Sequence, residues 1–254
     1  MNLITIGVSH YCDKARLALE LAELRYTEDA YVPILHRFAV KRAGGSGSTP
    51  TLVTGSRVID DSTDILAFIQ EHAESKWRPY PEDSQQRAEV EELEELFDEK
   101  LGPHTRRIAY FYLLPNKKLC TNMVEQVTPA WQVTVMKLGY PLFAEIMKRG
   151  MNITPAGAER SFARVDQIFD QVDALLSDGR EHLVGDHLTA ADITFAALAA
   201  PILLPDEYCT TMPRGGEETS EIEAFVARYS ARPAGQWALK LWRELRPDGF
   251  AAIH

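Results

Sequence analysis

The sequence has few cysteines, and the three it has, Cys12, Cys120 and Cys209, lie far apart without a Cys-x-x-Cys pair. A disulfide framework uses an even number of cysteines at close spacings, so this pattern argues against a disulfide-stabilised secreted domain. We therefore expect reduced thiols and a cytoplasmic location.

Long apolar runs and basic segments are also missing. The longest apolar stretch, residues 193–205, is too short to span a bilayer, and no basic region followed by an apolar core marks a signal peptide. The chain has 27 basic and 37 acidic residues, and its net charge of −10 repels nucleic-acid phosphates. We expect a soluble protein that binds neither membranes nor nucleic acid.

Motifs for metals and for nucleotide phosphates are incomplete. His10 and Cys12 alone supply too few ligands for a metal site. The glycine-rich stretch Gly44–Ser48 (GGSGS) lacks the Gly-Lys-Ser/Thr end of a phosphate-binding loop. We expect no metal and no phosphate loop.

What is present, first, is an α/β pattern in about 75 residues. Short β-branched segments predict strands, and apolar residues at helical spacing predict helices. The order is strand, helix, strand, helix, strand, strand, helix, over residues 3–8, 12–24, 26–32, 33–43, 51–54, 57–59 and 62–69. The strand–helix–strand unit implies a parallel pair, and a turn at Gly55-Ser56 predicts a hairpin. This is a mixed sheet with helices on both faces.

The remaining sequence predicts helices only. Residues 76–84 form a linker, since Pro79 and Pro81 interrupt a stretch without periodicity. Residues 85–254 then form an all-α domain. Its predicted helices span residues 85–100, 105–114, 122–137, 142–148, 154–176, 190–203, 221–230 and 233–244.

The sharpest local motif lies at the start of one of these helices. Thr189 is a predicted N-cap, and Asp192 three residues later can reach back to it as in a capping box. Leu188 and Ile193 can pack as a hydrophobic staple. We assign these residues to starting a buried helix and not to catalysis.

Together these features resemble a cytosolic glutathione transferase. The resemblance rests on the βαβ-αββα order, Thr49-Pro50 before a hairpin strand, the acidic-Ser helix start at Asp61-Ser62, and GDHLTAADITFAAL at residues 185–198. It covers nearly the whole chain, is weakest over residues 100–150, and defines no class. It implies a thioredoxin-like domain at residues 1–75, a helical domain at residues 85–254, glutathione as co-substrate, a homodimer and a role in detoxification.

The resemblance also implies which residues bind glutathione. Thr49-Pro50 matches a cis peptide whose first residue presents its backbone to the cysteinyl unit, and cis bonds are essentially confined to proline. Asp61 and Ser62, at a helix start, would hold the γ-glutamyl end, because helix N-termini bind carboxylates. His36 and Lys41 are the candidates for the glycyl carboxylate, although both can equally be solvated helix charges.

The tetrad Ser9-His10-Tyr11-Cys12 contains two candidates for the thiol chemistry. It resembles the glutaredoxin-type CPYC tetrad with serine at the position of the nucleophile. Serine cannot form a mixed disulfide, so the resemblance implies that Ser9 donates a hydrogen bond to the glutathione thiolate. Cys12 is the alternative, either as a buried structural thiol or as the centre of a thiol-disulfide oxidoreductase.

A hydrophobic electrophile would bind between the two domains. The candidate lining residues are His10, Tyr11, Tyr110, Phe111 and Tyr112, although aromatic residues at helical spacing are usually core. A non-catalytic interaction module with the same fold remains the alternative to an enzyme. The sequence leaves the electrophile and the reaction type open.

Overall fold

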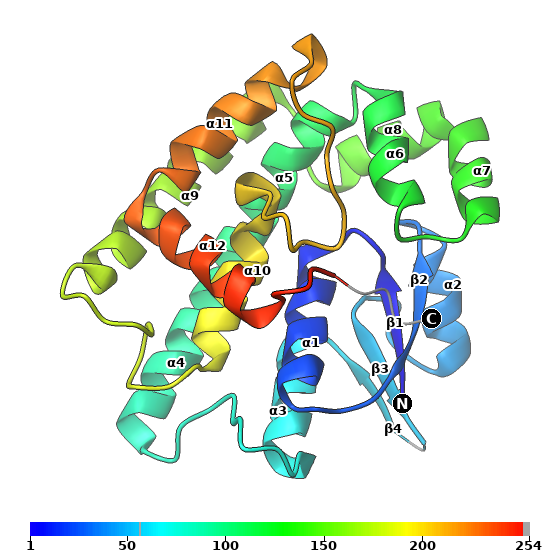
Figure 1. Ribbon diagram of the computed structural model, residues 1–254. Coiled ribbons are helices and arrows are strands. Elements are labelled where there is room, and N and C mark those ends of the chain that lie inside the picture. The colour runs from blue at the N-terminus through cyan, green and yellow to red at the C-terminus, as the bar shows by residue number, and fades with distance from the viewer. Residues whose placement is uncertain (56, 251–254) are drawn as a thin grey trace.

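The computed structural model describes residues 1–55 and 57–250 of the chain (Figure 1). Its N-terminal part contains a four-stranded sheet in the order β2-β1-β3-β4. The strands are β1 (Asn2–Ile6), β2 (Thr27–Tyr31), β3 (Thr51–Thr54) and β4 (Arg57–Asp60). β1 runs parallel to β2 and antiparallel to β3, which pairs antiparallel with β4. The predicted mixed sheet is confirmed, while Ser56 of the predicted turn lies outside the described residues.

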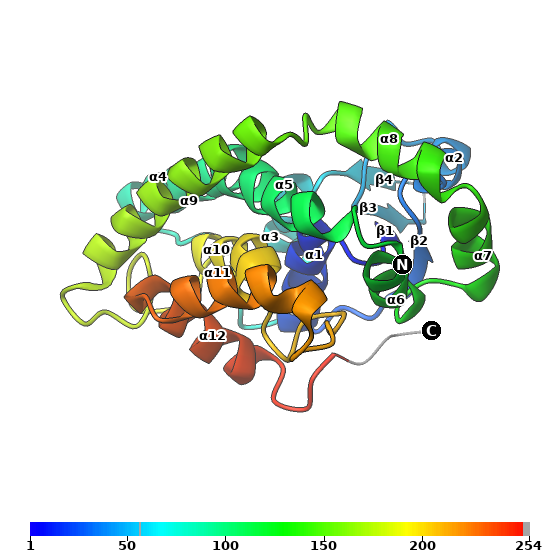
Figure 2. The same ribbon diagram turned by 90° about the horizontal axis from the view of Figure 1, so that it is seen from above.

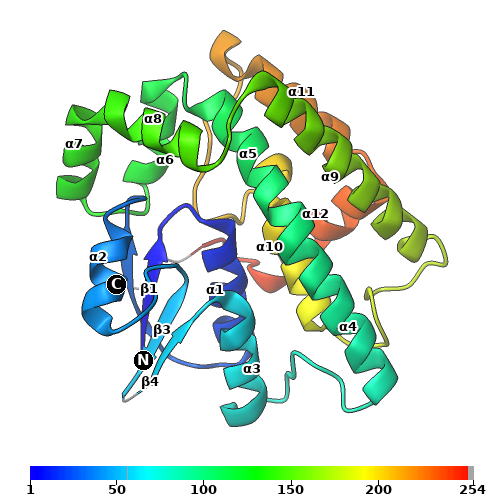
Figure 3. The same ribbon diagram turned by 180° about the vertical axis from the view of Figure 1, so that it is seen from behind.

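Three helices flank this sheet: α1 (His10–Leu21), α2 (His36–Ala43) and α3 (Ser62–His72). α1 and α3 lie together on one face, and α2 lies on the other (Figure 3). The helix that we expected to open at Pro33 begins only at His36. Ile34 has a φ of 81°, a backbone conformation that an α-helix cannot contain.

The rest of the chain is helical, as predicted. The helices are α4 (Ser84–Leu96), α5 (Gly102–Leu113), α6 (Lys117–Glu125), α7 (Ala130–Leu138), α8 (Tyr140–Gly150), α9 (Pro155–Leu176), α10 (Ala190–Leu203), α11 (Ser220–Ser230) and α12 (Pro233–Leu245). A π-helical turn, Phe97–Leu101, joins α4 directly to α5, so the gap predicted between residues 100 and 105 is wrong. Pro103 is the second residue of α5.

The single helix predicted over residues 122–137 is also wrong. The structure has two helices there, α6 and α7, with Thr128 and Pro129 between them. Proline lacks the N–H that would continue the helix and disfavours a helical conformation in the residue before it. The apolar spacing continues through this break, which is why periodicity alone did not reveal it.

The apolar core is continuous between the two parts of the chain. Helix α10 is buried almost throughout and contacts α1, α5, α11 and α12, and it lies in the middle of the helical part (Figure 2). The predicted capping box at its start is confirmed: Asp192 accepts the Thr189 N–H at 2.7 Å and also the Leu183 N–H at 2.8 Å. Because α1 packs on α10, the core fixes the start of α1 against the helical part.

No helix among residues 1–55 and 57–250 combines the length and the apolarity that a membrane span requires.

Candidate functional site

Ser9 stands where β1 ends and α1 begins. Its backbone N–H donates to the Ile6 carbonyl at 2.9 Å, and its carbonyl accepts the Asp13 N–H at 3.0 Å. The Ser9 side chain is half-buried and makes no capping hydrogen bond to the helix. A serine hydroxyl that is not used as a cap, at the positive end of a helix, can donate to an anionic ligand.

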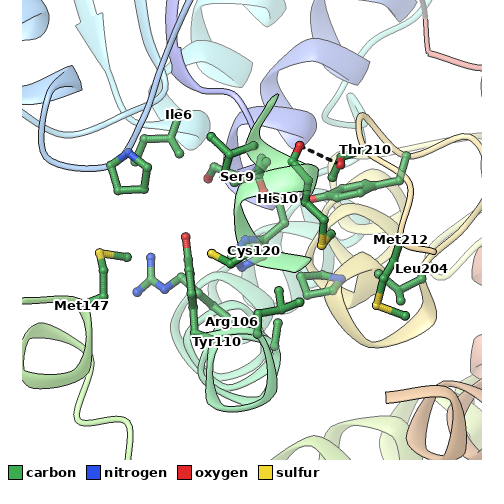
Figure 4. Close-up of a pocket in the computed structure, with 18 of the residues that line it drawn as sticks. Ile6, Ser9, His10, Arg106, Tyr110, Cys120, Met147, Leu204, Thr210 and Met212 are labelled. Atoms are coloured by element: carbon green, nitrogen blue, oxygen red, sulfur yellow. Dashed lines mark hydrogen bonds between the residues drawn. The ribbon is translucent and has the colours of Figure 1, made fainter. Parts of the chain in front are cut away.

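An apolar cavity opens beside Ser9, between the sheet and the helical part (Figure 4). Its walls come from the end of β1, from α5, α6 and α8, and from the segment after α10. Many of its lining residues contain sulfur or an aromatic ring, among them Cys120, Met123, Phe143, Met147, Met151, Tyr208, Met212 and Phe225. The cavity volume of about 130 Å³ suits a group of roughly the size of a benzene ring.

A second, more polar pocket adjoins this cavity. Four predicted glutathione ligands line it together: Thr49, Pro50, Asp61 and Ser62. Tyr11, which was predicted to line the electrophile site, lies in this second pocket and does not line the apolar cavity. The Thr49-Pro50 peptide bond is cis, which confirms that prediction. Arg106 of α5 lines both pockets and thereby marks where they meet.

The helix start predicted at Asp61-Ser62 is present in this second pocket. Asp61 is the N-cap of α3, and its carboxylate accepts the Thr63 N–H at 2.9 Å. Ser62 is the first residue of the helix and is buried. The free N–H groups of this first turn make it a suitable place for a carboxylate.

His10, the first residue of α1, makes a hydrogen bond to the first residue of α5. Its Nε2 lies 2.9 Å from the Gly102 carbonyl oxygen, which only accepts, so Nε2 carries the proton. Burial, reinforced by the charge of Arg106, lowers the pKa of His10 to about 3. The ring is therefore neutral at physiological pH, and it lines the apolar cavity as a positioning group.

Like His10, the Tyr11 side chain makes a hydrogen bond to a backbone carbonyl of the helical part. Its hydroxyl donates to the backbone carbonyl of Asp98 at 2.7 Å, and burial raises its pKa. A Cβ at Gly102 would collide with this hydroxyl, so glycine is required where Tyr11 crosses α5. The Tyr11 side chain lies between the N-terminal part and the helical part of the chain. Its hydroxyl proton is already donated to Asp98, so it is not free to react.

Five predicted site residues line neither of these two pockets: Cys12, His36, Lys41, Phe111 and Tyr112. His36 begins α2 half-buried, with a pKa lowered by burial, and Lys41 is exposed further along the same helix. Phe111 and Tyr112 follow Tyr110 on α5, but each residue of a helix turns by about 100°, which carries them off the cavity face. Tyr112 packs on Phe225, with ring centroids 5.4 Å apart.

Cys12 is fully buried in α1. Burial raises the pKa of its thiol to about 11, although Arg16 and the Ser9 hydroxyl act in the opposite direction. At pH 7 about one molecule in ten thousand would then carry the Cys12 thiolate. These features favour the structural role of Cys12 over the redox role.

We therefore predict that no cysteine of the native protein reacts rapidly with a thiol-specific disulfide dye at pH 7, because all three thiols are buried. Unfolding should release three equivalents. A rapid equivalent in the native protein that disappears in Cys12→Ala would contradict this assignment and favour the oxidoreductase.

A buried ion network joins α1 to the helical part beside the second pocket. The Lys14 ammonium contacts the Glu94 carboxylate at 2.8 Å, the Asp98 carboxylate at 2.5 Å and the Thr63 hydroxyl at 3.3 Å. The Tyr80 hydroxyl donates to Glu94 at 2.6 Å. Burial alone would lower the pKa of Lys14, but Asp98 and Glu94 outweigh it and raise that pKa. The network fixes the first turn of α3 against the π-helical turn.

The sequence analysis missed Arg106. An arginine on a charged helix is normally solvated, and nothing in the local pattern separates Arg106 from Arg107 beside it. The only sequence signal is its spacing of four residues from Tyr110, which puts both side chains on one helix face. Among the described residues, no group of three or more His, Cys, Asp or Glu side chains could hold a metal ion.

Comparison with known proteins agrees with this geometry. Family models for the glutathione S-transferase N-terminal domain and C-terminal domain match residues 3–77 and 155–206, respectively. The chain belongs to the glutathione S-transferase superfamily. No curated protein matches the sequence closely enough to count as a relative.

Solved structures show the same fold at low sequence identity. The β-etherase LigF from Sphingobium sp. strain SYK-6 is 20% identical, with 94% of this chain and 98% of that chain covered and a TM-score of 0.62. A bacterial zeta-class maleyl pyruvate isomerase is 18% identical, with 98% and 100% covered and a TM-score of 0.56. A theta-class transferase from Xanthomonas axonopodis pv. citri, solved with glutathione bound, is 17% identical, with 94% and 96% covered and a TM-score of 0.52.

Proposed function

We propose that the protein is a glutathione transferase in which the Ser9 hydroxyl stabilises the glutathione thiolate for attack on a hydrophobic electrophile. Glutathione would lie along the second pocket, with its γ-glutamyl end at Asp61-Ser62 and its cysteinyl backbone at Thr49-Pro50. Residues 1–75 would bind glutathione, residues 76–84 would be a linker, and residues 85–254 would supply the electrophile site.

The observation that carries this proposal is the position of the Ser9 hydroxyl at the start of α1, where it makes no capping hydrogen bond. Ser9 lines the apolar cavity, and the pocket lined by Thr49, Pro50, Asp61 and Ser62 adjoins that cavity at Arg106. A thiolate at Ser9 would therefore face this apolar cavity. The theta-class neighbour with glutathione bound supports glutathione as the ligand.

The reaction type stays open, because the same glutathione thiolate could begin several different reactions. Conjugation, isomerisation, peroxide reduction and reductive ether cleavage all begin with a reactive glutathione sulfur. The neighbours include a β-etherase and an isomerase, so the fold supports more than one of these reactions. An interaction module without catalysis would need no thiolate at all, which gives a direct test.

The test is calorimetric titration with glutathione and with S-methylglutathione at pH 7 in buffers of different ionisation enthalpy. If bound glutathione has a thiol pKa of about 6.5, binding should release about 0.7 proton per molecule. S-methylglutathione, which has no thiol proton, should bind without that release. Absence of glutathione binding, or binding without proton release, would favour the interaction module.

The γ-glutamyl assignment gives a prediction at Ser62. Ser62→Ala should weaken glutathione binding by roughly tenfold or more, because a hydrogen bond to a charged group contributes about 1.5–3 kcal/mol. The chain offers a matched control, since Asp83-Ser84 starts α4 with the same residue pair. Ser84→Ala should leave the dissociation constant of glutathione unchanged, and equal affinities for Ser62→Ala and wild type would rule out this assignment.

Following the resemblance, we further expect a cytoplasmic homodimer with a role in detoxification. The three free cysteines are consistent with a reducing compartment. Sedimentation of the purified protein should give twice the chain mass of 28.5 kDa, and a monomer at micromolar concentration would contradict the homodimer.

A further inference from the structure

Arg106 is a cation without a matching anion. Its Nε is buried and has no hydrogen-bond partner, and no Asp or Glu in residues 1–55 and 57–250 forms an ion pair with it. The guanidinium carbon lies 5.7 Å from the ring centroid of Tyr11, which orients the side chain without neutralising it. Arg107, the next residue, instead donates to the Met151 carbonyl and the Ser161 hydroxyl, each at 2.9 Å.

Tyr110 supplies a second unused donor. It lies one helical turn after Arg106 on α5, and its hydroxyl makes no hydrogen bond within the described residues. Burial raises the pKa of Tyr110, so the hydroxyl keeps its proton at physiological pH. Arg106 and Tyr110 both project from α5 into the part of the cavity that faces Ser9 and Ile6 (Figure 4).

The other residues that line this cavity include no carboxylate that could pair with Arg106. Met147, Cys120 and Met212 contribute soft apolar surface, which suits an aromatic ring. Arg106 is half-buried and its Nε is buried without a partner, and a carboxylate on the ligand would match its planar donors. The missing partner of Arg106 is therefore best supplied by the bound molecule.

We propose that the electrophile of this enzyme combines an apolar body of about benzene-ring size with a carboxylate, which Arg106 binds with Tyr110 as second donor. The reacting carbon would then lie on the side of the ring toward Ser9. The chemical step rests on the proposed transferase function, but the carboxylate site itself does not.

A probe reaction shows the chemistry. With 4-(chloromethyl)benzoate, the glutathione thiolate attacks the benzylic carbon, the S–C bond forms, and chloride leaves with the electron pair of the C–Cl bond. The carboxylate takes no part in this exchange. It holds the ring through Arg106, so the neutral 4-(chloromethyl)benzamide has the same reacting group without the anchor.

The first measurement is binding without glutathione, by calorimetry at pH 7, of 4-chlorobenzoate and 4-chlorobenzamide. Wild type should bind the carboxylate at least tenfold more tightly than the amide, since hydrogen bonds between charged partners are the strong ones. Arg106→Met and Arg106→Gln should each reduce this ratio to about two or less, and Tyr110→Phe should reduce it in part. The exposed Arg243 of α12 provides the control, and Arg243→Met should keep the wild-type ratio.

Three results would overturn the proposal. Wild type could bind both ligands equally, Arg106→Gln could keep the preference, or the Arg106 variants could lose glutathione affinity without any change in the ratio. The last result would assign Arg106 to glutathione. Two variants are used because one of them can misfold. The glutathione affinity of the Arg106 variants is measured in a separate titration. Since the benzoate and benzamide titrations contain no glutathione, loss of the carboxylate preference is distinct from loss of the proton release that tests the transferase.

The second measurement is the ratio of kcat/KM for 4-(chloromethyl)benzoate over 4-(chloromethyl)benzamide, followed as chloride release with saturating glutathione. The ratio should be about ten or more in wild type and should fall to about two in Arg106→Gln. An unchanged ratio in Arg106→Gln would overturn the proposal.

Discussion

Replacing Lys14 by methionine should lower the free energy of unfolding by about 3–5 kcal/mol, the usual cost of breaking a buried ion pair by removing one partner. Lys14 is fully buried, and its ammonium lies between the carboxylates of Glu94 and Asp98. Methionine fills a similar volume but leaves these carboxylates without a cation. Denaturant unfolding measures the change.

The control for this variant is Lys100→Met. Lys100 is exposed and pairs with Glu99 at 3.1 Å on the surface, so its removal should change stability by about 1 kcal/mol or less. A Lys14→Met effect no larger than this would contradict the account of the buried network.

The defect of Lys14→Met should also shrink as the pH falls. Burial raises the pKa of Asp98, and removal of the Lys14 charge would raise it further. A carboxyl group whose folded-state pKa lies above its unfolded value of about 3.9 binds protons more tightly when folded. The variant should therefore recover stability relative to wild type from neutral pH toward about pH 4. A defect that grows in this range would contradict the assignment.

The second large effect is expected for Ser9→Ala. A free thiol with a pKa of about 8.5 is only about 3% ionised at pH 7. Lowering that pKa by about two units requires about 2.7 kcal/mol. A hydrogen bond to a charged group contributes about 1.5–3 kcal/mol, and a helix N-terminus adds about 0.3–1 kcal/mol. The Ser9 hydroxyl and the start of α1 are therefore together sufficient to lower the pKa of the glutathione thiol by about two units.

The loss of activity in Ser9→Ala should depend on pH. Removing the hydroxyl lowers the thiolate fraction, but a thiolate of higher pKa is also more nucleophilic. These effects partly cancel, so the Ser9→Ala rate should be about tenfold below the wild-type rate at pH 6, equal to it at about pH 7.5–8, and several-fold above it near pH 9. The inflection of the pH–rate profile should move upward by as much as two pH units. Ser9→Thr, which keeps the hydroxyl, should keep the wild-type inflection, and a loss in Ser9→Ala that is equal at all pH values would argue against thiolate stabilisation.

Short-range patterns predicted much of this molecule. The order of strands and helices follows from local periodicity, and the Thr189-Asp192 capping box is a contact between residues three positions apart. The cis Thr49-Pro50 bond and the helix start at Asp61-Ser62 followed from the resemblance, because motif and spacing locate them. Features that depend on residues close together in the sequence could therefore be predicted from it.

Contacts between residues far apart in the sequence could not be predicted from it. In the buried ion network, Lys14 is separated from its two carboxylate partners by 80 and 84 positions in the sequence, and no local pattern relates these residues. The predicted pocket residues Phe111 and Tyr112 share a helix with Tyr110, and only packing decided which of the three lines the cavity. Arg106 was missed for the same reason, since its lack of a partner is a property of the folded environment.

The most direct test of the central claim is the thiol pKa of bound glutathione, measured by thiolate ultraviolet absorbance against pH for wild type and Ser9→Ala. We predict an apparent pKa of about 6.5 in wild type and a return toward about 8.5 in Ser9→Ala, with glutathione still bound in both. A wild-type pKa near 8.5, or a lowered pKa that persists in Ser9→Ala, would contradict the role proposed for the Ser9 hydroxyl.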